Sequence, residues 1–468
     1  MRRTKIVATI GPASGDPETL VRLIEAGMDV ARLNFAHGTP ESQAATAELV
    51  RQASDRAGRQ VAILQDLPGP KLRIGPLEHD IAELHIGDEL TIACGEESRG
   101  NAKRLSVSWD GLADAVEAGD AIYLADGSVR LCVTAVRADA GEVDAKVDVP
   151  GTVASRQGVN VPGELMALPS VPERDLELLR FGESIGVDMV ALSFVRRAED
   201  VESVREYTDV PLIAKIEKPQ AVKNAEEIVT AADCVMVARG DLGIELTLER
   251  VPLVQKEIIA VAGRHARPVI TATQMLESMV ASSRPTRAEV TDVANAILDG
   301  TDALMLSQET AVGAHPVEAV AMMASIAEQT EPAVPIKHWN EHRVWRDWRD
   351  PAYTVAYNAC AAARQLGLAA IICPTLSGRS ARLISAHRPD VPVYALSPRP
   401  EVVHRCSLMW GVTASFMPRR EVTEHLIADA VARALTLSWV KPGDRVAITA
   451  GLPSGKPGTT SLLQVQDV

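Results

Sequence analysis

Three charged residues occupy positions from which their side chains can bind a metal ion and an anion together. Glu217 follows the apolar run LIAKI, and Asp241 follows the next apolar run, CVMVA. The two carboxylates are hard oxygen ligands with no histidine or cysteine next to them, which suits Mg²⁺ or Mn²⁺ better than zinc. Lys215 precedes Glu217 by two residues, so both side chains share one face of an extended strand. The pattern predicts a divalent-metal site beside a fixed positive charge.

Further polar residues lie toward the ends of these and other apolar runs. They are Arg32, Asn34, Asp66, Arg239, Thr271, Thr273, Ser307 and Glu309. A buried strand can hold one such group in a structural ion pair, but a whole set at successive strand ends is expected only where strands converge on a site. Arg32 and Arg73 can donate forked hydrogen bonds to phosphate, and Gly240 permits close approach of an anion to the backbone. Arginine, lysine and Mg²⁺ around one point indicate phosphoryl transfer.

Eight short apolar runs have to position these groups, and helical patterns alternate with them. The runs lie at 5–11, 29–35, 61–66, 188–194, 212–218, 234–241, 268–274 and 303–309. Two of the helical patterns, 16–27 and 284–300, each close on a glycine. Alternating strands and helices form a parallel sheet. Eight such units predict an α/β fold of the (β/α)8 TIM barrel type, whose active site lies at the carboxyl ends of the strands.

A β-rich segment interrupts the third unit of this barrel. Connections from strand to helix usually span about 2–6 residues, but here the strand at 61–66 is followed by a helix only at 172–186. The stretches 82–94, 104–109, 120–136 and 141–149 resemble strands separated by Gly and Asp turns. We predict a small β-barrel, inserted at the catalytic face, where it can act as a lid.

The alternation restarts after residue 333 and predicts an open α/β domain at the C-terminus. The predicted domains are 1–68 and 159–333 for the barrel, 69–158 for the lid and 334–468 for a C-terminal regulatory domain. In the last domain, CPTLSGRSA runs from a strand into a helix through small hydroxyl residues, which is how helix N-termini bind phosphate. The residues of this predicted effector loop are Thr375, Ser377, Gly378, Arg379 and Ser380.

Composition excludes several classes of partner. The net charge of −14 over 468 residues argues against a general affinity for nucleic acid or anionic membranes. No apolar run approaches the roughly 18 residues of a membrane span. The six cysteines form no CxxC pair, which is typical of reduced thiols in a cytoplasmic protein.

Several long stretches resemble pyruvate kinase. They are ARLNFAHG, IAKIEK, VMVARGDLGIEL, ITATQMLESM, SRPTRAEVTDVANAILDGTDALMLSQET and GLPSGKPGTTSLLQV, and the resemblance extends over essentially the whole chain. It implies the last step of glycolysis, transfer of the phosphoryl group of phosphoenolpyruvate to ADP to give pyruvate and ATP, with Mg²⁺ or Mn²⁺ as cofactor. It also implies a homotetramer and a phosphorylated activator in the C-terminal domain.

The resemblance assigns roles to individual residues. Lys215 matches the lysine that stabilises the phosphoryl group in transit, Arg32 matches a phosphate-binding arginine, and Glu217 and Asp241 match the metal ligands. Two further groups match contacts to the substrate carboxylate (Gly240, Asp241 and Thr273) and to the nucleotide phosphates (Asn34, His37 and Arg73). Thr273 also matches a residue near the carbon that receives a proton.

The segment DLPGPKLR departs from the pattern of many pyruvate kinases, in which asparagine, serine and aspartate hold K⁺ with a glutamate nearby. Asn34 and Asp66 are present here, but Ala36 replaces the serine and Lys71 replaces the glutamate. An ammonium group and a free cation about 4 Å apart repel by roughly 4 kcal/mol at an effective dielectric constant of 20. We therefore predict that Lys71 substitutes for the ion, with Asp66 as its counter-ion, and that K⁺ is not required.

A second departure lies in the lid. Gln157 stands where the family often has a lysine that reaches the nucleotide, and Arg156 is the candidate substitute. Two alternatives to an active pyruvate kinase stay open at this point: a Mg²⁺-dependent barrel lyase or aldolase of pyruvate-like substrates, and a catalytically inactive regulatory paralogue. The lid and the C-terminal domain disfavour the first, and the presence of Lys215, Glu217 and Asp241 disfavours the second.

Overall fold

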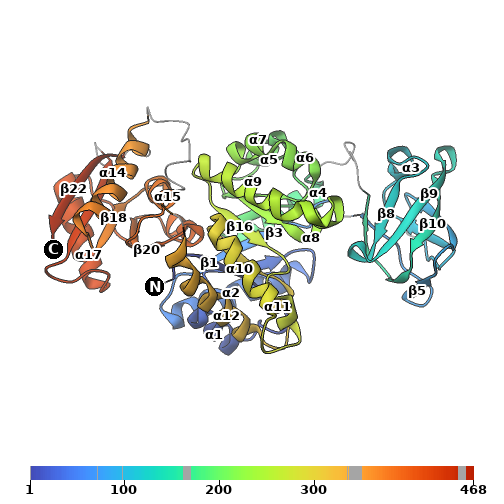
Figure 1. Cartoon of the computed structure of the whole chain (residues 1–468), viewed down its shortest axis with the longest axis horizontal. Coiled ribbons are helices and arrows are strands. Elements are labelled where there is room, and N and C mark those ends of the chain that lie inside the picture. Colours follow the sequence, from blue (N-terminus) through green and yellow to red (C-terminus); the bar gives the residue numbers. More distant parts are fainter. Residues whose placement is uncertain are drawn as a thin grey trace.

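Three bodies follow one another along the long axis of the molecule: the C-terminal domain, the barrel and the β-rich insertion (Figure 1). The computed structural model describes residues 2–70, 72–96, 98–161, 170–334, 336, 350–451 and 460–468. The insertion and the C-terminal domain lie on opposite sides of the barrel (Figure 1).

Eight parallel strands close into a barrel in the order β1-β17-β16-β15-β14-β13-β3-β2. They are β1 (Lys5–Thr9), β2 (Val30–Asn34), β3 (Ala62–Asp66), β13 (Met189–Leu192), β14 (Leu212–Ile216), β15 (Cys234–Ala238), β16 (Val269–Ala272) and β17 (Ala303–Leu306). Each lies within one of the eight predicted runs, so the predicted TIM barrel is confirmed. Most strands end before the run does, because the chain turns or enters a helix at the carboxyl end of the barrel.

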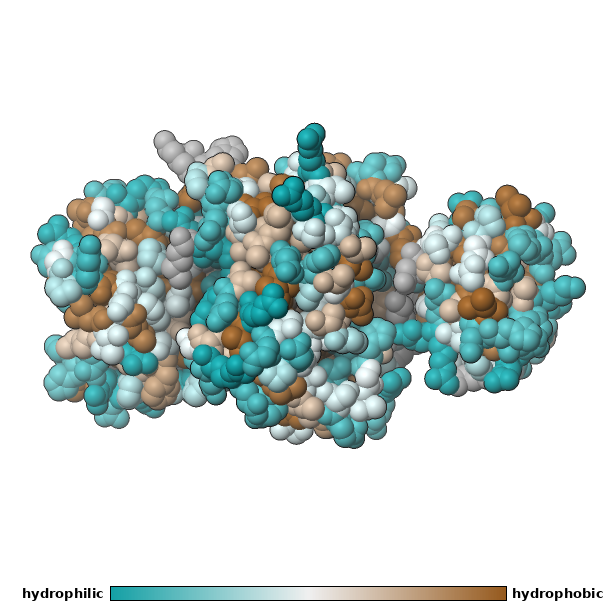
Figure 2. Space-filling model, turned by 90° about the horizontal axis from the view of Figure 1, so that it is seen from below, coloured by the Kyte–Doolittle hydropathy of each residue, from teal (hydrophilic) through white to brown (hydrophobic). Residues whose placement is uncertain are grey.

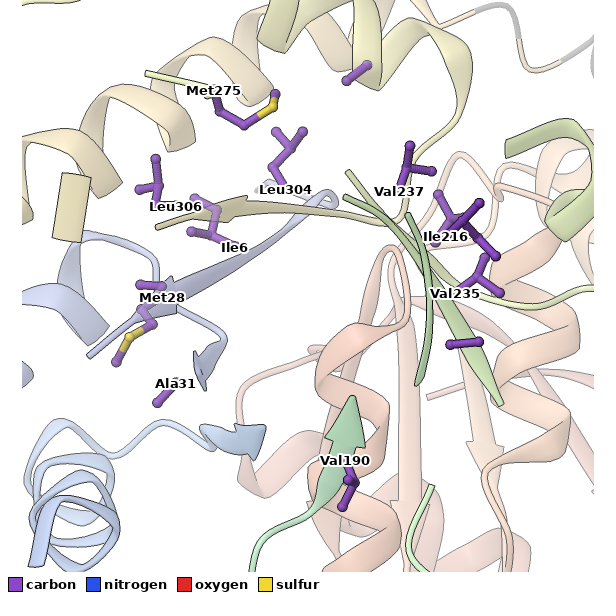
Figure 3. Packing of buried hydrophobic residues seen from close by; sticks show 14 of the residues in the cluster. Ile6, Met28, Ala31, Val190, Ile216, Val235, Val237, Met275, Leu304 and Leu306 are labelled. Carbon is purple, nitrogen blue, oxygen red and sulfur yellow. The ribbon is translucent and has the colours of Figure 1, made fainter. Parts of the chain in front are cut away.

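Alternation along the strands sorts side chains into an inner and an outer layer. Ile213 belongs to the cluster that fills the barrel, whereas Ile216, Val235 and Val237 belong to the cluster between strands and helices. Figure 3 shows these last three side chains close together on β14 and β15. Because residues two apart share a face, Lys215 continues the inner row that Ile213 begins.

Helices cover the outside of the barrel. They are α1 (Pro17–Ala26), α2 (Pro40–Ala57), α4 (Glu173–Ser184), α5 (Ala198–Arg205), α6 (Pro219–Lys223), α7 (Ala225–Ala231), α8 (Arg239–Glu245), α9 (Val251–Arg264), α10 (Arg287–Asp299), α11 (Gln308–Ala311) and α12 (Pro316–Thr330). Thr286 and Glu289 form a capping box at the start of α10, and Gly300 ends it in a left-handed conformation. Within the described ranges, no helix has both the length and the apolar character needed to cross a membrane.

The insertion is a seven-stranded sheet in the order β4-β12-β8-β9-β10-β6-β7. A bridge between Ile74, next to β4, and Val107 in β7 joins the two edges, so the sheet curves into a small barrel. Its elements are β4 (Leu72–Arg73), β6 (Glu89–Cys94), β7 (Arg104–Val107), α3 (Leu112–Ala115), β8 (Ala121–Leu124), β9 (Val129–Arg137), β10 (Glu142–Val149) and β12 (Gly158–Asn160), with β5 (Ile81–Leu84) and β11 (Gly151–Ala154) as a separate pair. Figure 2 shows the insertion as a lobe set apart from the rest.

The C-terminal domain has one five-stranded sheet in the order β20-β19-β18-β21-β22, parallel except for β22. Its elements are α14 (Pro351–Leu366), β18 (Ala370–Pro374), α15 (Arg379–Ala386), β19 (Val393–Ser397), α16 (Pro400–Arg405), β20 (Val412–Phe416), α17 (Thr423–Thr436), β21 (Arg445–Gly451) and β22 (Thr460–Asp467). An ion pair and a hydrogen bond join this domain to the amino ends of barrel strands: Arg388 pairs with Asp302 at 2.7 Å, and His404 Nδ1 is hydrogen-bonded to Asp188 Oδ1 at 2.8 Å. The domain therefore lies against the end of the barrel opposite the predicted site.

Candidate active site

Lys215 is the centre of a cluster of charges at the carboxyl end of the barrel. Its Nζ lies 2.8 Å from Glu217 Oε1 and 3.4 Å from Asp66 Oδ1. It also donates a hydrogen bond of 2.8 Å to Ser193 Oγ. Lys215 and Glu217 were predicted from one run and Asp66 from another, and strands β14 and β3 with the residue after β14 bring them together.

Burial and the nearest opposite charges shift the pKa values of these groups in opposite directions. Burial alone would lower the pKa of Lys215, but Asp66, Glu217 and Asp241 outweigh it and raise that pKa. Burial likewise opposes ionisation of Asp66, yet Lys215 and Arg32 hold the pKa of Asp66 below its ordinary value. For Glu217, burial dominates and raises the pKa; Lys215 opposes this effect and Asp241 adds to it. The cluster therefore keeps a permanent cation at its centre.

Arg32 explains why the buried strand β3 ends in a carboxylate. Its Nε lies 2.7 Å from Asp66 Oδ2, and its Nη1 donates to Thr9 Oγ1 at 2.8 Å. Asp66 is only 2% exposed, so its two oxygens are shared between Arg32 and Lys215. The carboxylate thus orients two cations toward the carboxyl end of the barrel.

The two predicted metal ligands approach this cluster from different elements. Glu217 follows β14, is 1% exposed, and accepts a hydrogen bond from the Phe194 backbone N–H at 2.8 Å. Asp241 lies on α8, not at the end of a strand as predicted. The run CVMVARGD leaves the sheet at Ala238 because the backbone turns directly into that helix.

Thr273 and Gly240 meet at the neighbouring strand end. The Gly240 backbone N–H donates to Thr273 Oγ1 at 2.7 Å. Thr273 and Gln274 both have positive φ angles, 69° and 53°, and Phe194 has 58°. Such strained backbone in residues other than glycine is concentrated at functional sites, where the surrounding structure holds it in place.

Three other groups that were predicted at strand ends make structural contacts away from the Lys215 cluster. Arg239 binds Asp292 at 2.7 Å and donates to the Thr273 carbonyl at 2.8 Å, so it clamps the loop after β16. Thr271 contacts Thr301 at 3.0 Å, because its neighbours Ile270 and Ala272 occupy the inner face. Glu309 is fully buried and accepts backbone hydrogen bonds from Leu276 and Ser307.

Of the three predicted nucleotide residues, Arg73 lines a cavity beside the insertion, whereas Asn34 and His37 are not among its lining residues. This cavity of about 420 Å³ is lined by residues that include Ala36, Arg73, Arg156 and Arg174. Arg73 donates to the Arg156 carbonyl at 3.0 Å, so Arg156 belongs to this wall. Asn34 accepts a hydrogen bond of 3.1 Å from the Ala36 N–H, and His37 is exposed on the segment after β2. Lys71, the predicted substitute for K⁺, lies outside the described residues.

The predicted effector loop forms a turn at the start of α15. Gly378 has φ 79°, and its N–H donates to Thr375 Oγ1 at 3.0 Å. Arg379 pairs with Asp350, and the Ser380 hydroxyl bonds to that of Thr460. Ser377 is exposed on the turn between them.

Sequence reasoning missed Ser193, the residue that follows β13. Its hydroxyl accepts from Lys215 and donates to the Leu67 carbonyl at 2.8 Å, where the chain leaves the barrel for the insertion. A Cβ on Gly69 would lie 2.8 Å from Ser193 Cβ, so this turn packs tightly against Ser193. Asp175, whose pKa burial raises to about 6, accepts the Gly69 N–H at 2.7 Å. The sequence offered one signal for Ser193. It lies near the carboxyl end of its apolar run, just as Asp66 lies at the end of β3.

Comparison with known proteins gives the same result along the whole chain. A family model for the pyruvate kinase barrel domain matches residues 1–320, and one for the pyruvate kinase alpha/beta domain matches residues 353–466. A pyruvate kinase of Geobacillus stearothermophilus is 44% identical over 99% of this chain and 80% of its own length. One of Mycobacterium tuberculosis is 42% identical over 100% of this chain and 98% of its own.

A solved structure supports the match in three dimensions. The crystal structure of a pyruvate kinase from Cryptosporidium parvum has a TM-score of 0.92 and 35% identity, covering 100% of this chain and 96% of that chain. The chain therefore belongs to the pyruvate kinase family, and it transfers the phosphoryl group of phosphoenolpyruvate to ADP.

Proposed function

We propose that Lys215 and Arg32 hold the phosphoryl group while it moves from phosphoenolpyruvate to ADP. The observation that carries this proposal is the position of Lys215 Nζ between Asp66 and Glu217. A cation fixed there can neutralise the charge that shifts as the bond to the enolate oxygen breaks. Loss of turnover in a folded Lys215→Met protein tests it.

We infer that Glu217 and Asp241 bind Mg²⁺ or Mn²⁺. Among the described residues, the buried Glu217 Oε1 has no hydrogen-bond partner besides the Lys215 ammonium at 2.8 Å, so it has a lone pair left for an ion. The described residues contain no group of three or more His, Cys, Asp or Glu suited to a metal. Substrate oxygens and water would then complete the shell, as Mg²⁺ allows. When bound, the ion neutralises phosphate and carboxylate charge.

Gly240, Asp241 and Thr273 are assigned to the carboxylate of phosphoenolpyruvate. The hydrogen bond from Gly240 to Thr273 supports this grouping, because it fixes the Thr273 hydroxyl at the strand end beside α8. Thr273 would then also lie near the carbon that receives a proton. The strained φ of Thr273 is consistent with a position held for catalysis.

We assign Asn34, His37 and Arg73 to the nucleotide phosphates and residues 69–158 to a lid that covers them. The cavity between barrel and insertion supports this, since three arginines line it and guanidinium groups bind phosphate in a forked geometry. Gln157 stands where the family often has a lysine, and Arg156 would contact the nucleotide in place of that lysine.

Ser193 leads to a prediction about the position of the lysine. Ser193→Ala removes the hydroxyl that joins Lys215 to Leu67. A hydrogen bond to a charged group contributes about 1.5–3 kcal/mol, so we expect kcat to fall by about 10- to 150-fold. Steady-state kinetics measures this, with Ser193→Thr as the control that keeps a hydroxyl. Unchanged kcat in the alanine variant would mean that the two carboxylates alone fix the lysine.

Members of the family generally use K⁺ as well as Mg²⁺, and we propose that this protein works without K⁺. Ala36 offers no side-chain oxygen, and the other two expected ligands are already engaged: Asn34 Oδ1 by the Ala36 N–H, and Asp66 by Arg32 and Lys215. Lys71 would supply the positive charge instead.

The expected result is full activity in tetramethylammonium or Tris salts, unchanged when K⁺ is added. Lys71→Glu should make the enzyme weak under the same conditions, and adding Ala36→Ser should let K⁺ restore part of the loss. Initial rates at matched ionic strength, with and without K⁺, measure both effects. A large activation of the unmutated protein by K⁺ would contradict the proposal.

We further propose that the protein is a cytoplasmic homotetramer with a phosphorylated activator at the loop of Thr375, Ser377, Gly378, Arg379 and Ser380. The turn supports the activator site by placing hydroxyl groups at the start of α15. Activity titrations with phosphorylated sugars and nucleotides, together with light scattering for mass, test the two parts separately.

A further inference from the structure

A buried ion pair connects the two elements that carry the metal carboxylates. Lys218 follows Glu217 directly, and Glu245 is the last residue of α8, one helical turn after Asp241. Lys218 Nζ donates to Glu245 Oε1, and the two side chains are only 10% and 1% exposed. Each partner is thus close in sequence to one of the metal carboxylates.

The same ammonium group also supports the backbone that holds Glu217. Lys218 Nζ lies 5.4 Å from the centre of the Phe194 ring, within the range of a cation–π contact. Phe194 in turn donates its backbone N–H to Glu217 Oε2. Lys218 therefore contacts both the far end of α8 and the residue that orients Glu217.

Helix α8 has anchors at both ends. At its start, Arg239 and Gly240 bind Thr273 through the hydrogen bonds described above. At its end, the carboxylate of Glu245 depends on Lys218, because Glu245 Oε2 has no hydrogen-bond partner in the described part of the chain. A helix this short keeps its place only through such contacts.

We propose that Lys218 and Glu245 are positioning residues that set the separation of Glu217 and Asp241. The proposal rests on the assignment of those two carboxylates to the metal. Neither Lys218 nor Glu245 is placed in contact with substrate. Through this ion pair, the residue that follows Glu217 is joined to the residue that lies one helical turn after Asp241.

Direct Mn²⁺ binding separates positioning from simple electrostatics. Removal of a nearby positive charge should by itself tighten cation binding, whereas loss of a positioning contact should weaken it. We expect Lys218→Met and Glu245→Gln each to weaken Mn²⁺ binding about tenfold, the lower part of the range for groups that orient metal ligands. Lys218→Met is the decisive variant, because Glu245→Gln removes a negative charge and weakens cation binding on either account. The double variant should lose no more than either single one, because the two substitutions break the same contact.

The measurement is the free Mn²⁺ signal in electron paramagnetic resonance, titrated with full-length protein and no substrate. Lys218→Arg should restore binding, since it keeps a charged donor. At saturating Mg²⁺, kcat should return close to normal while the Mg²⁺ concentration for half-maximal activity stays raised. Lys256→Met is the matched control, because Lys256 pairs with Asp299 on the outside of the barrel.

Two outcomes distinguish the failure of this inference from the failure of the metal assignment. If Glu217→Gln abolishes Mn²⁺ binding but Lys218→Met binds as tightly as the parent or more tightly, the positioning role is wrong. If Glu217→Gln binds Mn²⁺ normally, the metal lies elsewhere and the proposed function fails first. Additive losses in the double variant would also overturn the role of the pair.

Discussion

Replacement of Lys215 by methionine is expected to reduce kcat by at least about 100-fold, the range seen when one group that stabilises transition-state charge is lost. Methionine keeps much of the length of the side chain and removes only the ammonium group. That group lies within 3.4 Å of both Asp66 and Glu217. Without it, negative charge moving from the enolate oxygen to ADP has no fixed partner on this side of the barrel.

The fold should survive the substitution. Arg32 still pairs with Asp66, and Glu217, whose pKa burial already raises, can become neutral by taking up a proton. Lys5→Met is a suitable control, because this buried lysine at the other end of the barrel donates to the Val412 carbonyl at 2.7 Å. We expect it to lower the melting temperature and leave kcat unchanged. Near-normal turnover in folded Lys215→Met would refute the assigned role.

The barrel could be predicted because its strands are buried on both sides and read as apolar runs. The alternation of Ile213 and Lys215 then puts the Lys215 side chain on the inner face, where its Nζ lies 2.8 Å from Glu217 Oε1. The prediction for Thr271 was wrong. Its neighbours Ile270 and Ala272 face the inside of the barrel, so Thr271 faces outward and contacts Thr301.

Residues beyond the strand ends were harder to place, because side chains no longer alternate between the inner and outer faces once the strand ends. Arg239 looked like a site residue, yet α8 begins there and turns its guanidinium toward Asp292. Strand β20 gives only a weak signal in the sequence, because VTASF is partly buried and alternates weakly. Ser193 was missed because one serine after an apolar strand is chemically ordinary until the Lys215 ammonium is seen 2.8 Å away.

Substitution of the metal carboxylates should have the second large effect. Glu217→Gln and Asp241→Asn each remove one formal charge from a site with few protein ligands. Replacement of groups that merely orient ligands costs about 10–100-fold in metal affinity, so loss of a ligand itself should cost at least about 100-fold. Mn²⁺ titration without substrate and Mg²⁺ dependence of the rate are the two measurements.

Glu217→Gln should be the more damaging of the two. Glu217 is buried, pairs with Lys215 and accepts from Phe194, so an amide in its place puts an N–H₂ group against one of these donors. Asp241 lies half-buried on α8, and Asn can keep one oxygen toward the ion. Asp233→Asn is the matched control, because Asp233 precedes β15 at the opposite end of the barrel and pairs with Arg205. Metal dependence like that of the parent in both Glu217→Gln and Asp241→Asn would place the divalent ion elsewhere.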